Sequence, residues 1–124
     1  PSPDPTPPVV QALPYHPLGA PVPAEVSVAE LAAILEADPT TPVVDVRNPD
    51  EYAAGRVPGA VLVPMHTVPV RLQDLPRDRT LYLVCATGGR SAQTAAWLEP
   101  QGYDVVNVLG GTQAWFMSGY ALES

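Results

Sequence analysis

The sequence predicts an α/β domain in which helices cover both faces of a parallel sheet. From Val26 onward, short apolar segments rich in β-branched residues alternate with segments of helical spacing, and no internal repeat interrupts them. Two of the helical segments also begin with capping signals. Strands that are separated by helices pair in parallel through right-handed crossovers, which places helices on both sides of the sheet.

The first 23 residues differ in composition from the rest of the chain. Nine of the 17 prolines lie within residues 1–23, together with a single charged residue, Asp4. Proline fixes φ and lacks an N–H, so this stretch favours polyproline II or an irregular conformation. We therefore expect a proline-rich N-terminal arm or linker over residues 1–23 and one folded domain over residues 24–124. A tether is favoured over the PxxP ligand that residues 5–8 could form.

Capping signals mark the first two predicted helices. Ser27 and Glu30 form a capping box in front of apolar residues at helical spacing, because the serine hydroxyl and the glutamate can each accept from the other's N–H. Asn48 and Glu51 repeat this pattern, with Pro49 in the first turn. The second helix should be short, since glycine and proline follow closely.

Four apolar runs predict strands. They lie at residues 42–46, 60–63, 81–84 and 104–108. Residues 67–75 predict a short helix or an irregular crossover. A helix is expected over residues 92–101, where Gly102 stops it and Pro100 frays its last turn, and a final helix over residues 112–118.

Charge and cysteine content restrict the possible functions. The net charge is −7, from 13 acids and six arginines without lysine, so a basic face for nucleic acid or an anionic membrane is not expected. No apolar run approaches the roughly 20 residues of a membrane span. A single cysteine excludes an internal disulfide and a cysteine-rich zinc site.

We expect a monomer. A cytoplasmic location is slightly favoured, and the proline-rich start without methionine leaves the bacterial periplasm or another exported location open.

The stretch from Cys85 to Ser91 carries the candidate chemistry. A predicted strand leads into Cys85, Gly88 and Gly89 permit a tight turn, and a helix should begin near Arg90 or Ser91. Consecutive N–H groups in such a turn form an anion-binding nest, and the helix N-terminus adds positive potential. These surroundings lower a cysteine pKa and would hold the outer sulfur of a persulfide. The alternative is a small apolar residue that ends a strand, but the Gly-Gly-Arg-Ser that follows favours a reactive cysteine.

Several motifs, in this order, resemble the rhodanese-like sulfurtransferase family over about residues 26–120. They are Val43–Arg47 with Pro49–Tyr52, Gly55–Ala60, Cys85–Ser91, Gly102-Tyr103, and Val108–Gly111 with Trp115 behind.

The resemblance implies a five-stranded parallel sheet, with Cys85 as the persulfide-forming nucleophile and Arg90 as the residue that supports the anion. It implies substrate-binding positions at Ala86, Thr87, Gly88, Gly89, Ser91, Asp45 and Arg47. For Asp45 and Arg47, a structural role that ties the strand end to the helix of Glu51 is equally expected. Arg90 could also cap its helix and point to solvent.

Two departures from the family pattern concern charge. Arg56 stands where many relatives have histidine, and Ala86, Thr87 and Gly89 stand where thiosulfate-handling relatives often carry basic residues. Arg90 is then the only charged residue of the loop. A dianionic donor would be held weakly, so a low-molecular-weight persulfide or a protein persulfide is a plausible alternative to thiosulfate.

Three function classes follow. The favoured one is a sulfurtransferase that moves a sulfane sulfur from thiosulfate or a persulfide to a thiol, cyanide or a protein acceptor. The second is a non-catalytic binding or sensor module, and the third a cysteine-dependent phosphatase, whose loop would be one residue longer. No metal or organic cofactor is expected, because the cysteine supplies the covalent chemistry.

Overall fold

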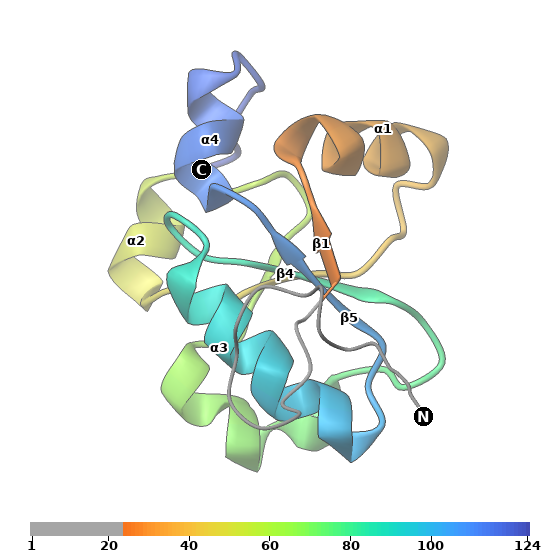
Figure 1. The fold of residues 1–124 in the computed structure, drawn as a ribbon. Helices are drawn as coiled ribbons and strands as arrows, with labels where there is room; N and C mark the ends of the chain where they lie inside the picture. The colour runs from red at the N-terminus through yellow and green to blue at the C-terminus, as the bar shows by residue number, and fades with distance from the viewer. Residues whose placement is uncertain (1–23) are drawn as a thin grey trace, which may run out of the picture.

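A five-stranded parallel sheet forms the centre of the domain in the computed structural model, which describes residues 24–124 (Figure 1). The strand order is β1-β5-β4-β2-β3. The strands are β1 (Ala24–Val26), β2 (Val43–Asp45), β3 (Val61–Leu62), β4 (Leu81–Val84) and β5 (Val105–Val108). The helices are α1 (Val28–Ala37), α2 (Pro49–Ala54), α3 (Gly89–Leu98) and α4 (Gly111–Met117). The predicted fold class is thereby confirmed.

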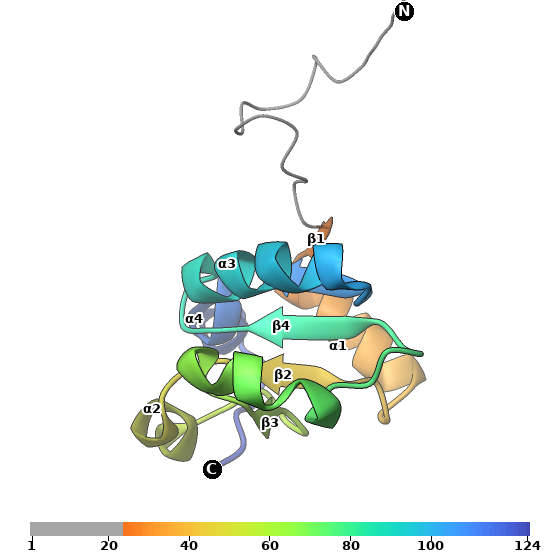
Figure 2. The ribbon, with the colours of Figure 1, turned by 90° about the horizontal axis from the view of Figure 1, so that it is seen from below.

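Helices cover both faces of the sheet. Helix α3 and the 3₁₀ segments Met65–Val70 and Leu72–Asp74 pack on one face, whereas α1 and α4 pack on the other (Figures 1 and 2). Helix α2 lies beyond the carboxyl ends of β2 and β4 (Figure 2). Two separate clusters of buried apolar side chains, one on each face, provide the hydrophobic stabilisation.

The alternation of side chains along the central strands places the functional groups. Leu81, Leu83 and Cys85 all belong to the cluster on the α3 face, whereas Val84 belongs to the opposite cluster. In β5, which pairs with β4 so that Leu83 lies opposite Asn107, the same alternation directs Asn107 toward α3. Cys85 and Asn107 therefore approach the first turn of α3 from neighbouring strands.

The capping signals predicted for the first two helices are confirmed. The Ser27 N–H donates to Glu30 Oε1 at 2.7 Å, and the Glu30 N–H donates to Ser27 Oγ at 3.0 Å. The Asn48 N–H donates to Glu51 Oε1 at 3.0 Å at the start of α2. These bonds satisfy N–H groups that have no partner within the helix.

The structure differs most from the sequence prediction at β1 and at the two ends of α3. Strand β1 has no counterpart among the four runs, because only three residues pair with β5 and their side chains are largely exposed. Helix α3 begins at Gly89, next to the start near Arg90 or Ser91 expected from the loop and before the expected range 92–101. Gly88 adopts a left-handed conformation that starts the helix early. Its α-helical part ends at Leu98, and Glu99–Gln101 continue as a 3₁₀ turn because Pro100 lacks the N–H that the α-helix needs.

The proposed arm over residues 1–23 lies outside the described residues. Within residues 24–124, no helix is long and apolar enough to cross a membrane.

The completeness of the sheet within residues 24–124 generates a prediction about the arm. Deletion of residues 1–23 should lower the free energy of unfolding by no more than about 1–2 kcal/mol, because all five strands remain. Deletion of residues 1–26 is the matched control. It removes β1 and the bond from the Leu109 N–H to the Val26 carbonyl, so it should cost clearly more. Denaturant unfolding of both variants measures this. Loss of the fold in the shorter deletion would show that the arm is part of the core.

Candidate active site

Cys85 follows β4 directly and begins a short turn that leads into α3. This position lies at the carboxyl edge of the sheet, where parallel α/β folds gather their reactive groups. Gly88 has φ of 109°, a conformation that suits glycine and turns the chain back toward the sulfur. Cys85 is 1% exposed, and it is the only cysteine of the chain.

Two donors contact the Cys85 sulfur within the turn. The Gly88 N–H lies 3.0 Å from Sγ, and the Ser91 Oγ lies 3.3 Å from it. Burial alone raises the pKa of the Cys85 thiol. The Ser91 hydroxyl and then the backbone N–H groups of Ser91, Gly88 and Thr87 act in the opposite direction, and together they hold the pKa below its ordinary value. The turn thus favours a thiolate.

The first turn of α4 donates hydrogen bonds to the backbone of the loop. The Thr112 N–H donates to the Cys85 carbonyl at 2.9 Å, and the Gln113 N–H donates to the Ala86 carbonyl at 3.0 Å. Gly111 has φ of 59°, and a Cβ at this position would collide with both carbonyl oxygens. Gly111 therefore permits the close packing of α4 against the loop backbone.

Asn107 joins the loop to β5 and was missed by the sequence analysis. Its residue exposure is only 2%. Its Oδ1 lies 2.6 Å from Ser91 Oγ, and its Nδ2 donates to the Gly88 carbonyl at 3.3 Å. One signal was available, since asparagine is the only polar residue in the apolar run Val105–Val108.

Arg90 lies in the first turn of α3 and pairs with Glu51 of α2. Its Nη1 and Nη2 donate to Glu51 Oε1 and Oε2 at 2.9 and 3.0 Å, and both side chains are about one-third exposed. This pair lowers the pKa of Glu51 to about 2 and raises the pKa of Arg90 above its ordinary value. The Cys85 thiolate makes a smaller contribution to the Arg90 shift. Sequence reasoning found Glu51 only as a capping residue.

Asp45 and Arg47 form a buried pair at the end of β2. Arg47 Nη2 lies 2.8 Å from Asp45 Oδ2 and also donates to the Gly55 carbonyl at 2.8 Å, where α2 ends. These contacts tie the strand end to α2, which is the structural role considered for them. Arg56 does not contribute to the loop hydrogen bonds: its guanidinium lies over the Tyr52 ring at 4.4 Å, and its Nε lies 3.5 Å from Glu123.

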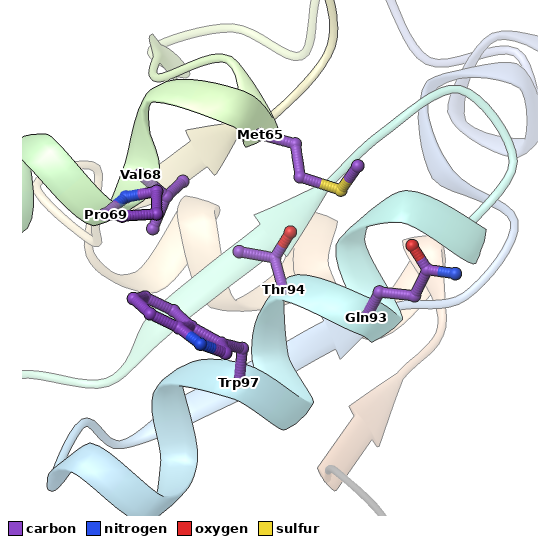
Figure 3. Close-up of a pocket in the computed structure, with 6 residues that line it drawn as sticks. All are labelled: Met65, Val68, Pro69, Gln93, Thr94 and Trp97. Carbon is purple, nitrogen blue, oxygen red and sulfur yellow. The ribbon is translucent and has the colours of Figure 1, made fainter.

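Two hollows lie close to α3 and the loop. A shallow cleft of about 380 Å³ lies beside the loop. Its lining includes Arg47, Glu51 and Ala86, together with Thr112, Gln113 and Phe116 of α4. A second groove of about 220 Å³ separates α3 from the 3₁₀ segment Met65–Val70 (Figure 3). Figure 3 shows Met65 and Thr94 facing each other across this groove. Gln93 lies toward one end of the groove and Trp97 toward the opposite end. The groove is apolar, and the donors to the Cys85 sulfur are not among its lining residues.

Comparison with known proteins identifies this arrangement. A family model described as the rhodanese-like domain matches residues 27–118. The chain belongs to the rhodanese-like family. It is 44% identical over 78 residues to a sulfurtransferase of Allochromatium vinosum, and this match covers 62% of the chain and 73% of the relative.

Solved structures of rhodanese-like proteins superpose well on this chain. A rhodanese-like domain protein from Staphylococcus aureus has a TM-score of 0.73 at 39% identity, over 82% of this chain and 99% of that one. A rhodanese-related protein from Thermoplasma volcanium has a TM-score of 0.75 at 30% identity, over 81% and 97% of the two chains. The rhodanese-like fold thus extends over nearly all of the described residues.

The hydrogen bonds to Cys85 generate a prediction about its ionisation. The rate of alkylation by iodoacetamide should rise with pH to a midpoint below about 8.5, because only the thiolate reacts and the loop donors stabilise it. At pH 6.5 the protein should react much faster than a short unstructured peptide that contains one cysteine. A midpoint at or above that of the peptide would contradict the assigned environment.

Proposed function

We propose that this rhodanese-like chain is a sulfurtransferase that holds a sulfane sulfur on Cys85 as a persulfide and passes it to a thiophilic acceptor. The observation that carries the proposal is the position of the Cys85 sulfur against the N–H of Gly88 and the hydroxyl of Ser91, with a lowered thiol pKa. A buried cysteine of purely structural role needs no such donors.

The reaction proceeds through two displacements at sulfur. In the first, the Cys85 thiolate attacks the sulfane sulfur of the donor, a new S–S bond forms, and the donor leaves with the electron pair of its broken bond. In the second, a thiolate or cyanide acceptor attacks the outer sulfur, and the Cys85 thiolate leaves. The outer sulfur carries the negative charge of the persulfide, and the backbone N–H groups of Ser91, Gly88 and Thr87 that act on the Cys85 thiolate would stabilise it.

Charge around the loop favours a persulfide donor over thiosulfate. Arg90 is the only cation of the loop, and Glu51 already binds its guanidinium through two hydrogen bonds. Thiosulfate is a dianion, and it would have to compete with this carboxylate for the guanidinium. A low-molecular-weight or protein persulfide brings less charge to the same position. We infer that Glu51 makes the site selective against dianionic donors.

The two other function classes have less support. A non-catalytic binding module does not require a cysteine with donors around its sulfur, as this chain has. A phosphatase would need a loop one residue longer than Cys85 to Arg90, to accommodate a tetrahedral phosphoryl group. Both the short loop and the relatives named as sulfurtransferases favour a sulfurtransferase over a phosphatase.

Mass spectrometry of the intact protein tests the persulfide directly. Incubation with a low-molecular-weight persulfide should add one sulfur atom, and subsequent cyanide should remove it. Cys85→Ser should neither gain sulfur nor transfer it, and it should keep the stability of the fold. Aryl phosphates should not be hydrolysed. Absence of a mass gain with any donor would overturn the proposal, and phosphatase activity lost in Cys85→Ser would favour the third class.

The ion pair between Arg90 and Glu51 generates a prediction about donor choice. Arg90→Ala should lower the rate of sulfur transfer by up to about 10²–10³-fold, because a charged donor to the anion is lost. Lysine should rescue only partly, since it lacks the planar fork of guanidinium. Glu51→Gln keeps the acceptor for the Asn48 N–H but frees Arg90, so kcat/KM for thiosulfate should rise several-fold relative to a persulfide donor.

Steady-state kinetics with the two donors measures both effects. If Arg90→Ala transfers sulfur within twofold of the unmodified protein, Arg90 has only a structural role. If Glu51→Gln changes both donors equally, the selectivity does not come from this pair.

A further inference from the structure

The hydroxyl of Ser91 lies within hydrogen-bond distance of two possible acceptors. Cys85 Sγ lies 3.3 Å from Ser91 Oγ, and Asn107 Oδ1 lies 2.6 Å from it. A serine hydroxyl has one proton, so it can donate to only one of these acceptors at a time. All three residues are buried, and so the group that is left without the proton pays the cost of an unsatisfied polar atom.

The contact with Gly88 determines which way Asn107 is oriented. Asn107 Nδ2 donates to the Gly88 carbonyl at 3.3 Å, and this bond turns Oδ1 toward Ser91. A carbonyl oxygen has no proton, and a separation of 2.6 Å between two oxygens requires one between them. With this orientation the Ser91 hydroxyl donates to Asn107, and its lone pairs face the sulfur. That arrangement suits a Cys85 thiol, which can donate its own S–H to Ser91 Oγ.

When Cys85 ionises, its sulfur changes from a hydrogen-bond donor to a hydrogen-bond acceptor. A thiolate has no proton to donate and accepts strongly, so the Ser91 hydroxyl must rotate toward it and leave Asn107 Oδ1 unsatisfied. When Cys85 carries a persulfide, the charge moves to the outer sulfur, and Sγ no longer competes for the hydroxyl. The demand for the Ser91 proton therefore changes with each state of the cysteine.

We propose that Asn107 is a positioning residue that competes with the Cys85 sulfur for the Ser91 proton, which goes to sulfur in the thiolate and to Asn107 in the persulfide. The role in the persulfide state rests on the proposed function, whereas the competition in the free enzyme does not. Asn107 thereby limits how far the hydrogen bond from Ser91 lowers the pKa of Cys85. Because the nucleophilicity of a thiolate falls with its pKa, this preserves the reactivity of the Cys85 sulfur. Asn107 also favours the sulfur-loaded enzyme over the free thiolate.

The charged groups around Cys85 do not explain such an effect of Asn107. They are Arg90 on α3, Glu51 on α2 and the Asp45–Arg47 pair after β2, and each is held by its own ion pair. Within residues 24–124, the side-chain hydrogen bonds of Asn107 go only to Ser91 and Gly88. A neutral substitution at position 107 therefore leaves all of these charges in place.

The test is the pH midpoint of Cys85 alkylation in Asn107→Leu. Leucine has a similar shape but no acceptor, so the Ser91 hydroxyl becomes free to serve the sulfur. The midpoint should fall by about 0.5–1 pH unit, as expected for the net contribution of one hydrogen bond. Equilibrium loading with a persulfide donor should fall about three- to tenfold. Asn107→Ala should shift the midpoint in the same direction, and its smaller side chain cannot clash with neighbouring residues.

A double-mutant cycle with Ser91→Ala separates competition from general damage. Ser91→Ala alone should raise the midpoint, and Asn107→Leu in that background should leave it unchanged. Thr94→Val is the matched control, because its buried hydroxyl donates to the Arg90 carbonyl one turn further along α3 and should leave the midpoint unchanged. A midpoint that rises or stays constant in Asn107→Leu, or that falls equally without Ser91, overturns the proposal.

The unmodified protein offers a measurement that needs no variant. The side-chain amide resonances of Asn107 should shift with the same midpoint as alkylation and return toward their thiol-state values when Cys85 carries sulfur. Resonances that stay fixed, or that stay in their thiolate position after loading, contradict the exchange. If the protein gains no sulfur by mass but Asn107→Leu still lowers the midpoint, the proposed function fails while the competition for the Ser91 proton stands.

Discussion

The seating of α4 against the Cys85 loop is the contact on which the site depends. A turn that directs its N–H groups toward a sulfur must direct carbonyl groups elsewhere, and buried carbonyls need donors. The first turn of α4 supplies them to Cys85 and Ala86, and Gly111 allows the two backbones to approach this closely. The loop is therefore fixed by an element that follows it by more than twenty residues.

The arginine side chains are almost all held in ion pairs within residues 24–124. Five of the six arginines form ion pairs, and the sixth, Arg77, donates to the Gln101 carbonyl and lies over the Tyr103 ring. The chain carries a net charge of −7, so long-range attraction of an anionic donor is not available to it. Under the proposed function, the sulfur is held, beside Arg90, by short-range dipoles of the backbone and of hydroxyl groups, which screening by salt affects little.

Local signals in the sequence were sufficient for most of the fold. The β-branched runs located β2, β4 and β5, and both capping boxes form as predicted. Strand β1 escaped because a three-residue edge strand has no periodicity to detect. In the site, the glycines after Cys85 pointed to the loop, but the partners of Ser91 and Arg90 did not follow. Asn107 and Glu51 come from distant elements, and only the pairing of β4 with β5 and the packing of α2 bring them to the loop.

The isolation of Cys85 has a consequence for oxidative damage. A cysteine that is converted to a sulfenic acid is usually rescued by a second thiol, which condenses with it to a disulfide before further oxidation. This chain has no second cysteine to act in that way. Recovery of an oxidised Cys85 therefore requires a thiol from another molecule, which must reach a side chain that is 1% exposed. The supply of small thiols and their access to the loop then set how quickly an oxidised Cys85 returns to its reduced form.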